Sequence, residues 1–131
     1  MPSIRPIHLF ALAALVAMAA AAADDIKGDA ARGKEQFMAS SCPTCHAVTK
    51  DDNSKLCPNL VGVVGRKAGT TKSLLGPSEN MKKYGVIWST ETLNEFLANP
   101  SAKVPGTAMA GILEDPQQRA DVIAYLATLT N

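Results

Sequence analysis

Histidine, cysteine and the aromatic residues are scarce in this chain of 131 residues. The sequence contains two histidines, three cysteines, one tryptophan, two tyrosines and three phenylalanines. Only His46 lies outside residues 1–23, so the rest of the chain cannot form a metal site with two histidine ligands. Three cysteines leave one unpaired in any disulfide scheme, which excludes an ordinary disulfide framework.

An excess of charge of either sign is absent as well. The chain has 13 Lys and Arg against 12 Asp and Glu, a formal net charge of +1. Proteins that bind nucleic acid through their overall charge carry a clear basic excess, so the composition excludes that class. No stretch alternates apolar and polar residues over the length of a strand. We therefore expect an all-α protein that binds no nucleic acid.

The first 25 residues, MPSIRPIHLFALAALVAMAAAAADD, have the pattern of a secretory signal peptide. Arg5 precedes an apolar run of Leu, Ala and Val, and small residues precede Asp24 and Asp25. The run is shorter than the ~20 apolar residues of a membrane-spanning helix, which disfavours the alternative of an uncleaved anchor. We predict cleavage after Ala23, which leaves one domain of residues 24–131 in the periplasm without stable membrane insertion.

Four segments of residues 24–131 carry helix signals, and loops lie between them. The helices are expected at residues 30–40 after the N-cap Asp29, at 78–85 from Ser78 to Gly85, at 89–99 before Pro100, and at 115–129 after the N-cap Asp115. Residues 42–75 have little periodicity and many Gly, Pro, Asn and Lys residues. Such long loops around few apolar residues indicate that something other than side chains fills the middle of the domain.

The segment CPTCH, residues 42–46, is compatible with three kinds of chemistry. In a haem protein, Cys42 and Cys45 would form thioethers with the porphyrin, and His46 would ligate the iron. A zinc site could use these three residues together with Cys57, but a histidine directly after a ligand cysteine reaches the same tetrahedral ion poorly. Disulfide exchange by Cys-x-x-Cys normally requires a βαβ frame, which this sequence lacks. The predicted export favours haem attachment, although the motif alone does not distinguish haem attachment from zinc binding or disulfide exchange.

A haem iron needs a second axial ligand or an open face. With one histidine available, the candidates outside the signal segment are Met38, Met81 and Met109. Met38 precedes the attachment motif too closely to reach over the ring, and Met81 lies among lysines in an expected helix. Met109 lies in the Pro/Gly-rich turn VPGTAMAGI, from which a thioether can point inward. Met109 is therefore the predicted second ligand.

Several motifs resemble the class I c-type cytochromes, and specifically the mitochondrial type and its bacterial relatives. They are GDAARGKEQF before CPTCH, then CPNLVGVVGRK, YGVIWSTETLNEFLANPSAKVPGTAM and RADVIAYL, in family order over nearly all of residues 28–131. The resemblance implies a small cytochrome c fold, with about four to five helices and long loops around one covalently bound haem c. It also implies that the first and last helices cross, with Gly33, Phe37 and Tyr125 at the crossing.

The same resemblance assigns roles to individual residues. It implies that Cys42 and Cys45 bind the haem covalently and that His46 and Met109 are the axial ligands of the iron. It places the Pro58 carbonyl where it accepts a hydrogen bond from the imidazole of the histidine ligand. Three further residues match positions near the haem propionates, namely Arg66, Trp88 and Thr107.

The function implied by this resemblance is one-electron transport, without enzymatic activity. Expected donors are a quinol-oxidising complex or a dehydrogenase, and expected acceptors are a terminal oxidase or another reductase. The protein would be a monomer that shuttles freely, or a dedicated electron-accepting subunit of a heteromeric oxidoreductase. The alternative is a haem protein with a labile Met109 ligand that acts as a peroxidase or a gas sensor.

Five features depart from the family pattern, and the first is one extra residue between Phe37 and Cys42. Phe96 stands where relatives often have a tyrosine whose hydroxyl contacts the methionine sulfur. The segment SLLGPSENM lacks the usual aromatic residues. The family's lysine ring is depleted, since Ser41, Ala102 and Ala108 occupy such places and Lys103 remains. Cys57 replaces a glycine, and it is either a free thiol without a role or a link to another chain.

Overall fold

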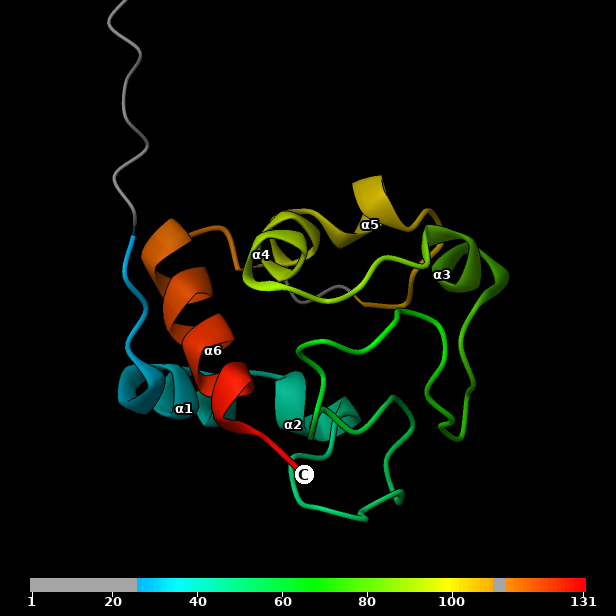
Figure 1. Ribbon diagram of the computed structural model, residues 1–131, viewed down its shortest axis with the longest axis horizontal. Helices are drawn as coiled ribbons and strands as arrows, with labels where there is room; N and C mark the ends of the chain where they lie inside the picture. The colour runs from blue at the N-terminus through cyan, green and yellow to red at the C-terminus, as the bar shows by residue number, and fades with distance from the viewer. Residues whose placement is uncertain (1–25, 110–112) are drawn as a thin grey trace, which may run out of the picture.

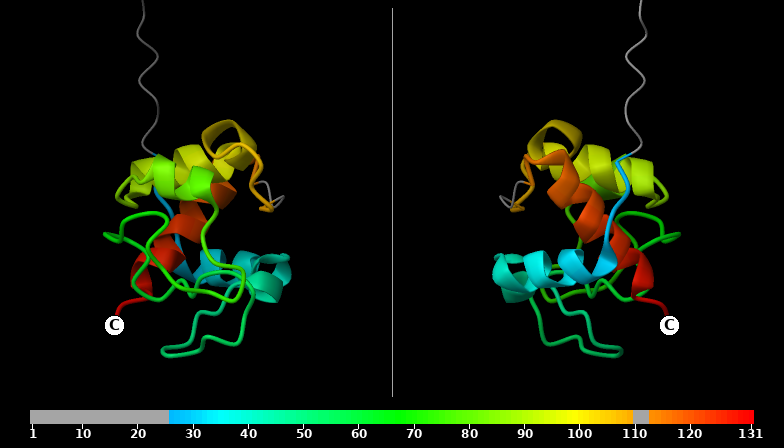
Figure 2. Two further views of the ribbon diagram at one scale, coloured as in Figure 1. Left: turned by 90° about the vertical axis from the view of Figure 1, so that its right-hand side faces the viewer. Right: turned by 90° about the vertical axis from the view of Figure 1, so that its left-hand side faces the viewer.

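The computed structural model describes residues 26–109 and 113–131, and within them the fold is all-α (Figures 1 and 2). The helices in chain order are α1 (Ala30–Ala39), α2 (Cys42–Cys45), α3 (Glu79–Tyr84), α4 (Thr90–Ala98), α5 (Pro100–Lys103) and α6 (Pro116–Thr128). Among these residues the one β-type pairing is an isolated bridge between Lys67 and Ile87. The all-α prediction is confirmed, whereas the predicted signal peptide and its cleavage point lie outside the described residues.

The helices form two groups that α6 joins. In Figure 1, α3, α4 and α5 lie together at the top, and α1 and α2 lie at the bottom; Figure 2 shows the same separation from both sides. Residues 46–77 form the long loops expected from the sequence. In the described part of the chain, every helix is too short or too polar to cross a membrane.

All four predicted helices are present, because their ends depend on short-range hydrogen bonds. The side chains of Asp29, Ser78 and Asp115 each accept a hydrogen bond from a backbone N–H three residues later. Gly85 ends α3 in the left-handed conformation, with a φ of 48°. Ser89 and Thr92 form a reciprocal capping box at the start of α4, which the sequence analysis did not identify.

Two helices were missed, and both have only four residues. From the sequence, Pro100 is expected only to stop α4. Proline also suits the first turn of a helix, and Pro100 begins α5 after Asn99, whose side chain caps Ala102 N–H at 3.2 Å. The other short helix, α2, contains the Cys-x-x-Cys segment itself, where four residues are too few to show a helical period.

The predicted crossing of the first and last helices is confirmed, and it depends on glycine. A Cβ atom added to Gly33 in α1 would lie 1.9 Å from the Asp121 carbonyl oxygen of α6, so the backbones approach closer than any side chain allows. Beside this contact, the rings of Phe37 and Tyr125 pack with centroids 5.5 Å apart.

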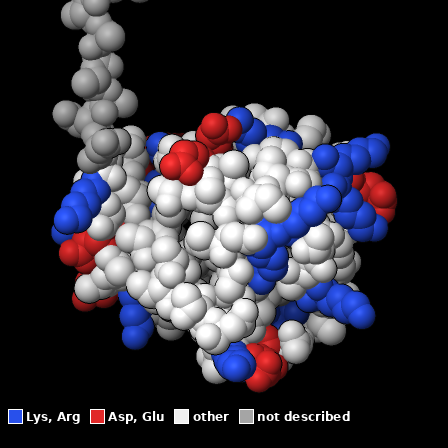
Figure 3. All heavy atoms as spheres, in the orientation of Figure 1, with Lys and Arg blue, Asp and Glu red and all other residues white. Residues whose placement is uncertain are grey.

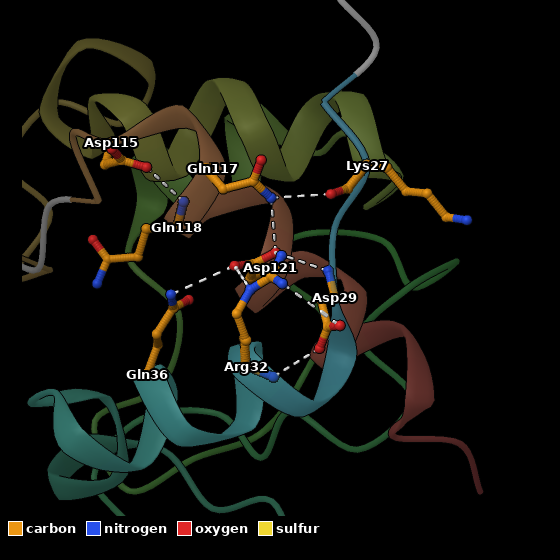
Figure 4. Close-up of polar contacts among 8 residues, drawn as sticks. All are labelled: Lys27, Asp29, Arg32, Gln36, Asp115, Gln117, Gln118 and Asp121. Carbon is orange, nitrogen blue, oxygen red and sulfur yellow. Dashed lines mark hydrogen bonds and ion pairs between the residues drawn. The ribbon is translucent and has the colours of Figure 1, made fainter.

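Asp121 anchors the same crossing through a polar network that the sequence analysis missed (Figure 4). Its carboxylate is 1% exposed and accepts hydrogen bonds from Arg32 Nε at 3.0 Å and from Asp29 N–H at 2.8 Å. Gln117 Nε2 adds a further bond at 2.9 Å. The hydrogen bond from Arg32 is the main reason why the pKa of Asp121 lies well below its usual range, and it outweighs the opposing effect of burial.

The core lies between the helix groups and is built from α1, α4, α6 and the loops. Its buried side chains are Phe37, Val63, Ala68, Trp88, Leu93, Phe96, Leu97, Val104, Leu113, Val122, Ile123, Tyr125 and Leu126. Met109 and Cys42 are partly buried and pack against this cluster. The core therefore extends to both of the segments that the sequence analysis selected as functional.

Candidate haem site

The short helix α2 places Cys42 and Cys45 on the same side of one turn. Side chains three residues apart on a helix are neighbours, and both cysteines are partly exposed free thiols. Cys42 N–H donates to Ser40 Oγ at 3.2 Å, which fixes the start of the turn. His46 leaves the helix with an extended backbone, and its N–H donates to the Cys42 carbonyl at 2.9 Å. The motif is therefore a preformed turn that presents two thiols.

The imidazole of His46 is held by the Pro58 carbonyl. Its Nδ1 lies 2.7 Å from Pro58 O, which is the hydrogen bond that the family resemblance implies. Burial is the main cause that lowers the pKa of His46; the Pro58 carbonyl opposes this effect and the positive charge of Arg66 adds to it. A neutral ring whose Nδ1–H is bonded to a carbonyl keeps Nε2 as an unprotonated nitrogen, which is the form that ligates a metal.

Pro58 reaches His46 because the chain folds back on itself. Cys57 N–H donates to the Cys45 carbonyl at 3.0 Å, and Leu60 N–H donates to the Ala47 carbonyl at 2.9 Å. These two bonds flank the His46–Pro58 contact. Residues 45–47 and 57–60, joined in this way, are called the His46 clasp below.

Met109 lies in a turn that its own backbone supports. Its N–H donates to Thr107 Oγ1 at 3.2 Å, and Thr107 N–H donates to the Val104 carbonyl at 3.1 Å. Asn80 of α3 donates from Nδ2 to the Pro105 carbonyl at 2.7 Å, an exposed bond that connects this turn to another helix. Among the described residues, no hydrogen bond joins the Met109 turn to the His46 clasp.

Arg66 and Trp88 are brought together by their backbones. Trp88 N–H donates to the Arg66 carbonyl at 2.9 Å, and the guanidinium of Arg66 donates to the carbonyls of Asn59 at 3.0 Å and Val61 at 3.3 Å. The half-buried Arg66 therefore braces the segment that follows Pro58, and burial lowers its pKa. Within the described residues, no acceptor is found for the indole N–H of Trp88.

Phe96 lies in an aromatic cluster that was not predicted from the sequence. Its ring centroid is 5.2 Å from Trp88 and 6.3 Å from Tyr84. Tyr84 was missed because it falls at the end of a short helix without apolar periodicity. Burial is the main cause that raises the pKa of Tyr84; the charge of Lys103 opposes this effect and that of Glu95 adds to it.

A sequence profile of the cytochrome c family matches residues 30–130. A cytochrome c from Tetrahymena pyriformis is 46% identical over 105 residues, which cover 79% of this chain and 91% of that relative. A cytochrome c2 from Rhodomicrobium vannielii is 43% identical over 102 residues, which cover 77% of this chain and 79% of that relative. A cytochrome c homolog from Bradyrhizobium diazoefficiens is 45% identical over 94 residues, and the match spans 70% of this chain but half of that longer protein.

The fold and the preformed turn define a small all-α haem protein of the c type. The chain belongs to the cytochrome c family. This family binds one haem c per chain covalently through its Cys-x-x-Cys-His motif, and residues 42–46 are the one such motif in this sequence. The observed geometry fits that group, since two free thiols share one turn and the adjacent neutral histidine is held by a carbonyl.

Proposed function

We propose that this chain is an exported one-electron carrier that uses a single haem c with His46 and Met109 as axial ligands. The supporting observation is the bond between His46 Nδ1 and Pro58 O, because it orients Nε2 and leaves it unprotonated. When bound, the haem supplies an iron that alternates between two oxidation states. Cys42 and Cys45 hold it covalently, and the partly buried Met109 supplies a thioether from the Thr107 turn.

The roles proposed for the remaining site residues are supporting ones. Trp88 lies beside Arg66 in the backbone pairing. We assign these two residues and the Thr107 hydroxyl to the neighbourhood of the haem propionates. Pro58 keeps the imidazole in one orientation and tunes the iron through the His46 bond.

The ligand set is tested by absorption spectroscopy of the oxidised protein. A weak band near ~695 nm reports an iron bond to a methionine sulfur. We expect this band in the wild type and in Met81→Ala, the matched control for another partly buried methionine, and we expect its loss in Met109→Ala. A band that survives in Met109→Ala and disappears in Met81→Ala would reverse the assignment.

Export and partners form the second part of the proposal. Residues 1–23 would direct the chain to the periplasm, where a quinol-oxidising complex or dehydrogenase reduces it and a terminal oxidase or other reductase oxidises it. The protein would be a free monomer or a subunit of a heteromeric oxidoreductase. Cell fractionation with N-terminal sequencing tests export, and an N-terminus at Met1 on a cytosolic protein contradicts it. Co-purification from the source organism tests whether an enzyme retains it.

Phe96 favours one alternative, a haem protein with a labile Met109 ligand. This ring is buried and carries no hydroxyl that could donate a hydrogen bond to the methionine sulfur. Such a protein would bind carbon monoxide rapidly in the reduced state and would oxidise a phenolic substrate with peroxide. Slow carbon monoxide binding together with negligible peroxidase turnover would support the carrier function over this alternative.

A further inference from the structure

Cys57 lies against one of the two haem-attachment cysteines. Its backbone N–H donates to the Cys45 carbonyl at 3.0 Å. Burial raises the pKa of the Cys57 thiol most, and the neighbouring Cys45 side chain raises it further. Both thiols are free and partly buried. The third cysteine therefore faces the attachment motif of its own chain, which disfavours the earlier hypothesis that it links to another chain.

The His46 clasp makes this contact a local feature of the chain. The bonds His46 Nδ1 to Pro58 O and Leu60 N–H to Ala47 O lie directly beside the two cysteines. A backbone N–H to O bond between two residues brings their Cα atoms into the range of about 4.4–6.8 Å that a disulfide requires. Only residues 46–56 separate the cysteines, so the loop can close without the complete fold.

We propose that Cys45 and Cys57 form a disulfide in the chain before haem is attached, and that this disulfide controls attachment. Each thiol gives up one hydrogen and an S–S bond forms, while a small-molecule disulfide such as oxidised glutathione is reduced to two thiols. Haem attachment adds the Cys45 S–H across a vinyl group, so this sulfur cannot react until a dithiol reduces the disulfide. Cys42 remains free throughout.

The competing bond is a disulfide between Cys42 and Cys45. These residues share one turn of α2, and disulfides across two intervening residues occur in redox proteins, so this bond competes directly for the Cys45 thiol. The structure also brings Cys57 to Cys45, through the 3.0 Å backbone bond of the His46 clasp. Thus the same thiol has two possible partners, and on our proposal the clasp favours the one outside the motif.

Peptide mapping tests which bond forms. The full chain is produced in a host without haem-attachment machinery, equilibrated with oxidised and reduced glutathione, and alkylated before digestion with trypsin. Trypsin separates residues 35–50, which contain Cys42 and Cys45, from residues 56–66, which contain Cys57. We expect these peptides to be cross-linked in the wild type and in Cys42→Ala, and the cross-link to be lost in Cys45→Ala. A dominant Cys42–Cys45 bond, or a cross-link equally abundant in both variants, would overturn the proposal.

Haem attachment provides the second readout. Apo chain is mixed with ferrous haem and increasing dithiothreitol, and covalent haem is measured as absorbance that remains with the denatured chain. We expect the wild type to require dithiothreitol and Cys57→Ala to lose most of this requirement. Equal dithiothreitol requirements in the two chains would contradict control by Cys57. This outcome is separate from electron transport, because it measures attachment rather than reduction of the iron.

Discussion

The half of the molecule around His46 and the half around Met109 are stabilised differently. The first half contains α1, α2 and α6, and its polar contacts converge on the buried carboxylate of Asp121 and on the His46 clasp. The second half contains α3, α4 and α5, and several of its polar connections are exposed, such as Asn80 to the Pro105 carbonyl and Lys103 to Glu95. Buried, multiply bonded groups contribute more stability than exposed single bonds.

This difference indicates which axial ligand is easier to displace. The imidazole ring of His46 is fixed by its 2.7 Å hydrogen bond with the Pro58 carbonyl. The described hydrogen bond of Met109, in contrast, involves its backbone N–H and not its side chain. Phe96 adds no hydrogen bond to the methionine side. We therefore expect local opening to begin at the Met109 turn while the His46 half stays folded.

Removal of the Asp121 carboxylate gives the largest expected loss of stability. Asp121→Ala leaves the Arg32 guanidinium and the Asp29 N–H without their acceptor, while the neighbouring backbones stay packed. We expect the free energy of unfolding of the haem-loaded protein to fall by ~2–4 kcal/mol, measured by urea denaturation and circular dichroism. The lower part of this range reflects the exposure of Arg32, whose side chain is 55% exposed.

Asp115→Ala is the matched control for this measurement. Asp115 is an exposed aspartate on the same helix, and its side chain caps Gln118 N–H at 2.7 Å (Figure 4). Loss of an N-cap costs about 1 kcal/mol, so this variant should be clearly less destabilised. Equal losses in the two variants would mean that the Asp121 network adds nothing beyond an ordinary cap.

The same carboxylate predicts how stability depends on pH. The pKa of Asp121 is lower in the folded protein than the value of about 3.9 expected for an unfolded chain. Its contribution is therefore complete above about pH 5 and is lost as the pH falls through the unfolded pKa toward the folded one. We expect the stability difference between wild type and Asp121→Asn to shrink below about pH 5. A constant difference from pH 7 to pH 3 would contradict the assigned shift.

The sequence predicted the parts of the molecule that depend on neighbours along the chain. The caps at Asp29, Ser78 and Asp115 were identified because each acts on a residue three positions away. Asp121 was missed because its main partner is 89 positions distant. The contact of Cys57 with Cys45 was missed for a related reason, since it exists only after residues 46–56 fold back.

The site residues divide in the same way. The resemblance to known cytochromes predicted the His46–Pro58 bond and the crossing at Gly33, both of which the structure contains. The roles of Arg66, Trp88 and Thr107 near the propionates stay predictions. Periodicity could not have revealed Tyr84 or the α5 turn, because neither belongs to a segment long enough to show a repeat.

The Asn80 bond allows a direct test of the Met109 half. Asn80→Ala removes the exposed hydrogen bond to the Pro105 carbonyl, which is worth ~0.5–1.5 kcal/mol. If this bond holds the Met109 turn closed, imidazole should displace the methionine about three- to tenfold more readily from the oxidised protein. Titration of the absorption band near ~695 nm measures this affinity.

Asn94→Ala serves as the control for this titration. Asn94 makes a similar exposed bond, accepting from Arg119 Nε at 2.9 Å, but it braces α4 against α6 instead of the Met109 turn. The affinity of the Asn94→Ala variant for imidazole should match that of the wild type. An equal increase in both variants would show that general destabilisation, and not the Met109 turn, governs ligand displacement.

The smallest expected effect concerns the salt dependence of electron transfer. Lys103, the lysine that remains from the family's basic ring, is paired with Glu95 at 2.6 Å. On the face shown in Figure 3, acidic side chains lie beside basic ones at several places around the rim, a basic stretch crosses the face to the right of its centre, and much of the remaining surface is uncharged. Of the 13 Lys and Arg residues, Arg5 alone lies in residues 1–23, so residues 24–131 have 12 basic and 12 acidic residues and should attract an anionic partner only weakly.

Stopped-flow oxidation of the reduced protein by ferricyanide measures this attraction. We expect the rate constant to fall by less than about threefold between about 0.01 M and 0.1 M ionic strength, a range over which the screening length shortens from about 30 to 10 Å. Glu95→Gln removes the carboxylate paired with Lys103 and should steepen this dependence. Glu79→Gln is the control, because it removes the carboxylate paired with Lys82 on α3. Lys82 is not one of the ring positions, so this variant should change the salt dependence less. A steep fall in the wild type would mean that other basic residues replace the depleted ring and that an acidic partner docks by electrostatic steering.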